Sequence, residues 1–131
     1  QRAAFALGHD AVALVAADTP HADPANYDQA FDLLGHNDVV LGPSNDGGYY
    51  LLATRKVTQG LFPAMHWSGP DVAATTRALA LSAGLDLAEV AMCQDVDTFD
   101  DLLAVADVLR RRRPHTRSLR IIERFALAVA S

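Results

Sequence analysis

The sequence predicts an α/β fold, a three-layer sandwich around a mixed, mostly parallel sheet. Short apolar runs alternate with segments of helical spacing along the 131 residues, and this alternation is typical of α/β proteins. Half of the residues are hydrophobic, which is enough for the core of one domain spanning residues 1–131. Two strand-like runs are joined by a short polar turn, so at least one strand pair should be antiparallel and the sheet mixed.

The chain opens on what looks like the end of a helix, with Gly8 as its stop. The apolar run 12–17 then closes on Asp18, and its unbroken apolar character predicts a strand buried on both faces. Pro20 has no N–H group and should end the strand. Ligands of α/β sheets gather beyond the carboxyl ends of strands, so Asp18 is either a ligand-site residue or a simple cap. His21, three residues later, could assist a metal or a phosphate.

Four later segments have helical spacing and recognisable ends: residues 24–34, 71–83, 98–113 and 116–130. Asp23 and Thr98 fit the N-cap positions of the first and third of these helices. Gly84 fits the stop of the second helix. The fourth helix forms the larger part of an expected C-terminal helical extension, residues 114–131.

A polar turn of four residues joins the strand-like runs 39–41 and 49–52: Asn45, Asp46, Gly47 and Gly48. The two glycines can adopt positive φ and let a ligand approach the main chain. An ordinary hairpin turn uses the same residue types. Both interpretations, a hairpin turn and a ligand loop, remain open on these residues alone.

Asp95 and Asp97 follow the short apolar run 85–92. Their side chains share one face if the segment is extended. Two close carboxylates repel each other unless a cation lies between them, and hard oxygen ligands suit Mg²⁺ or Mn²⁺. Asp100 and Asp101 fit the first turn of the next helix, where acidic side chains are favourable. That helix does not account for Asp95 and Asp97.

Taken together, these motifs resemble the nucleotide-diphospho-sugar transferase superfamily, which has the GT-A fold. The closest resemblance is to bacterial glycosyltransferase-like proteins grouped as DUF2064. Phospholactate guanylyltransferases and molybdenum-cofactor nucleotidyltransferases are similar at a greater distance. The resemblance covers residues 1–109 and rests on the order of four segments: 17–20, 39–51, 65–68 and 95–98.

The resemblance implies roles for individual residues. Asp18 and Asp97, with Asp95 beside them, would hold Mg²⁺ or Mn²⁺ at one edge of the sheet. Asp46, in the loop bordering the donor sugar or acceptor, and His66, near an acceptor hydroxyl, are the candidate catalytic residues. The residues expected to bind donor or acceptor are Thr19, Asn45, Asp46, Gly47, Gly48, Tyr49, Trp67 and Ser68.

The function expected from this resemblance is that of a metal-dependent transferase with a nucleotide-activated donor, most simply glycosyl transfer from a nucleotide-sugar. Nucleotidyl transfer of the guanylyltransferase type is the alternative, because a metal that bridges phosphate oxygens serves both reactions. Such transferases normally open with a Gly- and basic-rich nucleotide loop, and the sequence has no G-x-G-x-x-G or P-loop pattern. We therefore expect the C-terminal portion of a transferase, which need not be active alone, or else a non-catalytic binding or assembly module.

Composition limits the location and the kinds of partner that can be expected for the chain. Cys93 is the single cysteine, so no intrachain disulfide can form, and a cytoplasmic location is expected. No apolar run approaches the roughly 20 residues of a membrane span. Residues 1–109 carry 4 basic and 15 acidic side chains, and this acidity argues against nucleic acid. The expected partners are a nucleotide-sugar or nucleoside triphosphate donor and a small-molecule acceptor.

The C-terminal segment 110–131 reverses this charge, with 7 basic residues and 1 acidic residue. Its last helix carries an apolar stripe with helical spacing: Leu119, Ile122, Phe125, Ala126 and Val129. An isolated helix of this length is marginal in water. We therefore expect the stripe to dock on the transferase body or to form a homodimer.

Overall fold

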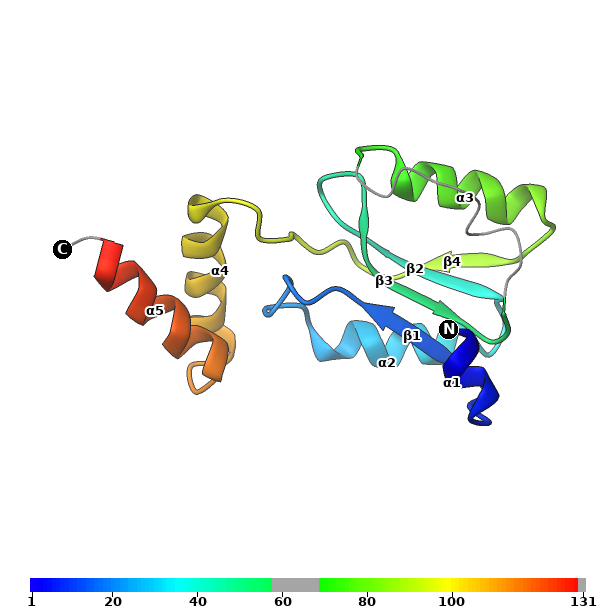
Figure 1. Ribbon diagram of the computed structural model, residues 1–131, viewed down its shortest axis with the longest axis horizontal. Helices are drawn as coiled ribbons and strands as arrows, with labels where there is room; N and C mark the ends of the chain where they lie inside the picture. Colours follow the sequence, from blue (N-terminus) through cyan, green and yellow to red (C-terminus); the bar gives the residue numbers. More distant parts are fainter. Residues whose placement is uncertain (58–68, 130–131) are drawn as a thin grey trace. The chain divides into compact units, whose positions relative to one another are not determined.

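The computed structural model describes residues 1–57 and 69–129 (Figure 1). Its helices and strands follow one another in this order: α1 (Arg2–Ala6), β1 (Val12–Val15), α2 (Pro24–Leu33), β2 (Val39–Pro43), β3 (Tyr49–Thr54), α3 (Val72–Ser82), β4 (Leu87–Glu89), α4 (Phe99–Arg112) and α5 (Arg117–Val129). The predicted alternation of strands and helices is confirmed.

Within the described residues the strands form one mixed sheet in the order β1-β3-β2-β4. Strand β3 is antiparallel to both β1 and β2, and β2 is parallel to β4. The other three strands therefore run in one direction, and their carboxyl ends reach the same edge of the sheet. The predicted mixed sheet, with β3 as its reversed strand, is confirmed.

Helices cover both faces of this sheet, α3 on one side and α2 on the other (Figure 1). On the α3 side, Val39, Leu41 and Leu52 form a buried cluster with Ala73 and Ala80. Val39 and Leu41 point to the same face because side chains alternate along a strand. The three-layer arrangement is therefore confirmed.

Strand β1 departs from the prediction of a strand buried on both faces. Leu14 is 45% exposed and Val15 is 57% exposed. The physical reason is position, because β1 lies at the end of the strand order and pairs with β3 on one side within the described chain. An apolar run shows that a strand is suited to burial, but it does not show which neighbours cover it.

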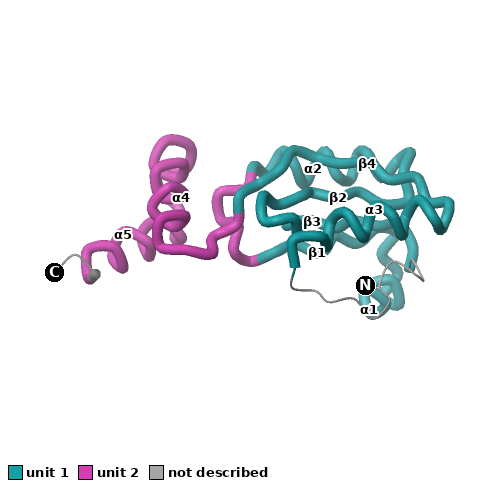
Figure 2. The backbone as a smooth tube through the Cα atoms, turned by 90° about the horizontal axis from the view of Figure 1, so that it is seen from above, with its two compact units in different colours: residues 1–16, 23–94 teal, residues 17–22, 95–131 magenta. Residues whose placement is uncertain are grey.

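The chain divides into two compact units (Figure 2). Unit 1 consists of Gln1–Ala16 and Asp23–Gln94, and unit 2 consists of Ala17–Ala22 and Asp95–Ser131. Unit 1 contains the sheet with α1, α2 and α3, whereas unit 2 contains α4 and α5. The expected single domain with an extension from residue 114 stays a prediction; α4 belongs to the same unit as that extension.

The two helices of unit 2 share a small apolar core: Val105, Ala106, Leu109, Leu119 and Ile122. The apolar stripe of α5 is thus buried against α4 at Leu119 and Ile122. Phe125 departs from the expected stripe because it is 53% exposed, and its ring meets that of Phe99 edge-on at 6.3 Å. The side chain of Val129 lies outside the described part.

The predicted helix ends are confirmed in detail. Asp23 caps α2 by accepting a 3.0 Å hydrogen bond from the amide of Ala25. Thr98 and Asp101 form a reciprocal capping box at the start of α4. Gly8 and Gly84 adopt positive φ just after α1 and α3. In the described chain, no helix has both the length and the apolar character required to cross a membrane.

Candidate functional site

The polar turn between β2 and β3 is a hairpin turn closed by main-chain hydrogen bonds. The amide of Ser44 donates to the carbonyl of Gly48 at 3.0 Å, and the amide of Gly47 donates back to Ser44 at 3.3 Å. Gly47 has a φ of 89°, which confirms the expectation that one of the two glycines adopts positive φ. Asp46 and Asn45 lie exposed at the tip of this turn.

The carboxylate of Asp46 has a fixed orientation. Its Oδ1 atom accepts hydrogen bonds from the amide of Gly48 at 2.8 Å and from the hydroxyl of Ser44 at 2.5 Å. Ser44 is itself buried at the end of β2. Two donors on one oxygen hold the side chain against rotation, so the turn presents this carboxylate in a defined direction.

Gly47 is required by the protein's own packing. A Cβ atom at this position would lie 1.8 Å from the carbonyl oxygen of Pro70. The carbonyl of Gly47 also accepts a 2.9 Å hydrogen bond from the amide of Ala73. The close approach that a glycine permits is therefore an approach to the start of α3.

The segment after β4 runs alongside this turn. The amide of Cys93 donates to the carbonyl of Pro43 at 3.0 Å, and Cys93 forms a parallel bridge with Ser44. Asp46 lies two residues beyond Ser44, and Asp95 lies two residues beyond Cys93. The bridge thus places Ser44 and Cys93, from which the chain leads to these two aspartates, at the same edge of the sheet.

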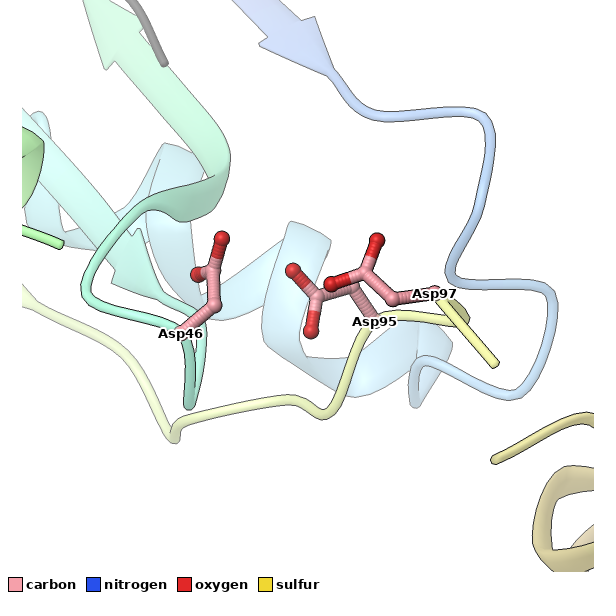
Figure 3. Close-up of side chains that lie close together, drawn as sticks. All are labelled: Asp46, Asp95 and Asp97. Atoms are coloured by element: carbon pink, nitrogen blue, oxygen red, sulfur yellow. The ribbon is translucent and has the colours of Figure 1, made fainter. Parts of the chain in front are cut away.

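Three carboxylates form an acidic group: Asp46, Asp95 and Asp97 (Figure 3). Each offers one oxygen, and these oxygens lie within 4.8 Å of one another. Asp95 is half-buried, whereas the other two are exposed. Oxygen atoms in this number and spacing fit a hard divalent cation such as Mg²⁺ or Mn²⁺. The group joins two residues expected to bind a metal with Asp46, which was expected to be catalytic.

Asp18, the third expected metal ligand, follows β1 in an exposed bend. It is not part of the acidic group found among the described residues. Strand directions do put the carboxyl end of β1 at the same edge as those of β2 and β4. The neighbouring Thr19 is buried, and its hydroxyl has no hydrogen-bond partner among the described residues. A ligand role for Asp18 and a binding role for Thr19 stay predictions.

His21 lies in the same short segment, which α4 holds through its last residues. The guanidinium of Arg113 donates a 2.7 Å hydrogen bond to the carbonyl of Ala22. Partial burial lowers the pKa of His21, and the positive charges of Arg113 and Arg112 lower it further. A neutral imidazole is therefore favoured at this position.

The remaining expected site residues divide into two groups. Tyr49 is half-buried and packs against the apolar cluster under α3. Burial raises the pKa of its hydroxyl, partly offset by a hydrogen bond with Thr76, so the fold alone accounts for this tyrosine. Three others lie outside the described residues: His66, Trp67 and Ser68.

Neither Ser44 nor Tyr50 was among the residues expected at the site. Ser44 orients Asp46, and Tyr50 contacts the segment that carries Asp95, as detailed below. Ser44 was detectable in principle, because serine is a common turn residue whose hydroxyl forms local hydrogen bonds. The contact of Tyr50 spans 41 residues of sequence and has no local signal.

Comparison with protein families identifies the group to which the chain is related. Residues 1–69 match the family described as "Uncharacterized protein conserved in bacteria (DUF2064)". This match covers more than half of the chain. The chain belongs to this family. None of the curated proteins matches it.

The DUF2064 chain is also similar to a solved structure from Desulfovibrio desulfuricans G20, titled as a "putative nucleotide-diphospho-sugar transferase". The two are 28% identical with a TM-score of 0.86. The match covers 97% of this chain and 56% of the Desulfovibrio protein, so the present chain spans little more than half the length of that protein. The similarity confirms the expected fold and supports a transferase-like kind of protein.

Proposed function

We propose that this DUF2064 chain carries the cation-binding edge of a transferase that uses a nucleotide-activated donor, most simply a nucleotide-sugar. The observation that carries this proposal is the acidic group of Asp46, Asp95 and Asp97. It follows the carboxyl ends of β2 and β4, the edge at which α/β proteins usually bind ligands. The similarity to the Desulfovibrio protein supports the same reaction class.

The residues of the acidic group would hold Mg²⁺ or Mn²⁺, and Asp18 is proposed as a further ligand from the family resemblance. Such a cation neutralises the negative charge that develops on a leaving diphosphate. Ser44 and Gly48 contribute by holding the Asp46 carboxylate in one orientation. A fixed carboxylate loses little conformational freedom when a ligand binds, which favours affinity.

Binding of Mn²⁺ to the purified chain, measured by calorimetry or electron paramagnetic resonance, is the direct test. Asp95→Asn should weaken Mn²⁺ binding at least roughly tenfold, because removing a charged ligand costs more than 1.4 kcal/mol. Asp28→Asn on the exposed surface of α2 is the matched control and should bind Mn²⁺ as the wild type does. A wild-type chain that does not bind Mn²⁺ at millimolar concentration, or Asp95→Asn with unchanged affinity, would refute the proposal.

Products of turnover distinguish the two kinds of transfer. Glycosyl transfer releases a nucleoside diphosphate, whereas nucleotidyl transfer from a triphosphate releases pyrophosphate. The assay belongs to a protein of the full length seen in the Desulfovibrio relative, because the chain covers 56% of that protein. A non-catalytic module would bind the cation and a nucleotide without releasing either product. A homodimer through α5 and a cytoplasmic location stay predictions.

A further inference from the structure

Tyr50 connects three parts of unit 1 through its hydroxyl group. The side chain is 1% exposed. Its hydroxyl accepts a 2.9 Å hydrogen bond from the amide group of Asn26 on α2 and donates a 2.9 Å hydrogen bond to the carbonyl of Ala91 after β4. A phenylalanine would fill the same space and leave the Asn26 amide group and the Ala91 carbonyl without this partner.

The path of the Tyr50 ring depends on an irregularity in the sheet. Gly42 pairs with Leu51 and Pro43 pairs with Tyr49, so the register shifts at this point and Tyr50 has no partner of its own on β2. The ring crosses β2 at Gly42, where a Cβ atom would lie 2.8 Å from two ring carbons. The bulge and the glycine together let the hydroxyl reach the far side of β2.

The segment that receives this hydroxyl leads directly into the acidic group. Strand β4 ends at Glu89, and residues 91–94 continue as irregular chain with Met92 exposed. The segment buries the Cys93 side chain, whereas Ala91, Met92 and Gln94 are exposed. Its position depends on the amide of Cys93, bonded to Pro43, and on the carbonyl of Ala91, bonded to Tyr50. Asp95 is the residue that directly follows this segment.

We propose that Tyr50 is a positioning residue for the cation site, because its hydroxyl fixes the segment that leads into Asp95. This inference rests on the proposed function. Tyr50 is not one of the carboxylates of the acidic group, and its hydroxyl is bonded to Asn26 and Ala91. Its effect passes through the main chain of residues 91–94, which the bond to Ala91 holds against the sheet.

Tyr50→Phe removes the hydroxyl and keeps the ring. The affinity for Mn²⁺ should fall roughly three- to tenfold, the range that the loss of one hydrogen bond supports. Hydrogen exchange at the Cys93 amide should accelerate. Tyr27→Phe is the matched control, because the Tyr27 ring packs edge-on against Tyr50 at 6.3 Å; it should leave both quantities unchanged. Asn26→Ala leaves the bond between Tyr50 and Ala91 in place, so it should lower the Mn²⁺ affinity less than Tyr50→Phe does.

The outcomes separate this inference from the proposed function. A purely structural Tyr50 would show a lower melting temperature for Tyr50→Phe with unchanged Mn²⁺ affinity and unchanged Cys93 exchange, and this result overturns the inference while leaving the cation site intact. A wild-type chain that fails to bind Mn²⁺ overturns the proposed function and, with it, the link from Tyr50 to a cation. Hydrogen exchange at Cys93 then still decides whether the hydroxyl holds the segment.

Discussion

The amide of Ala73 donates a 2.9 Å hydrogen bond to the carbonyl of Gly47 and so joins the β2–β3 turn to the first turn of α3. The same glycine has a φ of 89°, and its α-carbon faces the carbonyl of Pro70 so closely that a Cβ atom would lie 1.8 Å from the oxygen. Conformation and space therefore both require glycine at this position. The turn that carries Asp46 is held from α3 as well as from its own strands.

Three glycine-to-alanine variants separate these two requirements. Among the described residues Gly69 has neither positive φ nor a neighbour within 4 Å, and Gly84 has a φ of 66° with no neighbour within 4 Å. Gly47 has both a positive φ and a clash. We expect Gly69→Ala to be near neutral, Gly84→Ala to cost about 1 kcal/mol of unfolding free energy, and Gly47→Ala to cost more than about 3 kcal/mol. Urea unfolding gives the ranking. Equal losses at Gly47 and Gly84 would show that the contact with Pro70 relaxes without cost.

Gly48 has the opposite expectation, because its surroundings are the polar atoms of the turn. A Cβ atom there would lie 3.1 Å from Oδ1 of Asp46 and 3.2 Å from the hydroxyl of Ser44. Gly48→Ala should therefore displace the Asp46 carboxylate and weaken Mn²⁺ binding several-fold, with a loss of stability below about 1 kcal/mol. Gly48→Val introduces a larger side chain and should increase both effects, with the loss of Mn²⁺ binding still greater than the loss of stability. Intact binding with a collapsed melting temperature would mean that the turn is purely structural.

Much of the fold was predictable from the sequence because its signals are local. Asp23 and Thr98 cap helices through residues two or three positions away. Gly8 and Gly84 end helices through their own φ angles. The hairpin between β2 and β3 follows from turn chemistry within four residues. In each case one short stretch of sequence contains both the cause and its effect.

The features that the sequence did not predict depend on contacts between distant residues. The exposure of Leu14 depends on which strand lies beside β1, and the burial of Tyr50 depends on a register shift opposite Gly42. Asp46 was expected near the substrate, but its proximity to Asp95 needs the bridge between Ser44 and Cys93. Neither the bridge nor the shift has a residue pattern of its own.

The core of unit 2 gives a stability test of the amphipathic helix α5. Leu119 is 3% exposed and Phe125 is 53% exposed. Leu119→Ala should therefore cost about 2–5 kcal/mol of unfolding free energy, whereas Phe125→Ala loses mainly its edge-on contact with Phe99, about 0.5–1.5 kcal/mol. Arg120→Ala, on the exposed side of the same helix, is the control and should change stability by less than about 0.5 kcal/mol. A larger loss at Phe125 than at Leu119 would indicate that Phe125 is buried in an assembly, as the predicted homodimer requires, and size-exclusion chromatography of Phe125→Ala would then show dissociation.

The histidine beside the end of α4 should make unit 2 sensitive to acid. Burial, Arg113 and Arg112 all lower the pKa of His21 from its usual 6.5, so the unfolded chain binds a proton at this residue more readily than the folded chain does. Stability from this residue is therefore complete above pH 6.5 and declines as the pH falls from 6.5 toward and through the lowered folded pKa. His21→Gln should therefore show a smaller fall in melting temperature on acidification than the wild type.

Nuclear magnetic resonance titration of His21 measures its pKa directly. Arg113→Gln should raise the His21 pKa, because it removes a nearby positive charge and the hydrogen bond to Ala22. Arg111→Gln, in the same arginine run, should not raise it. An unchanged His21 pKa in Arg113→Gln would show that Arg113 does not govern this segment.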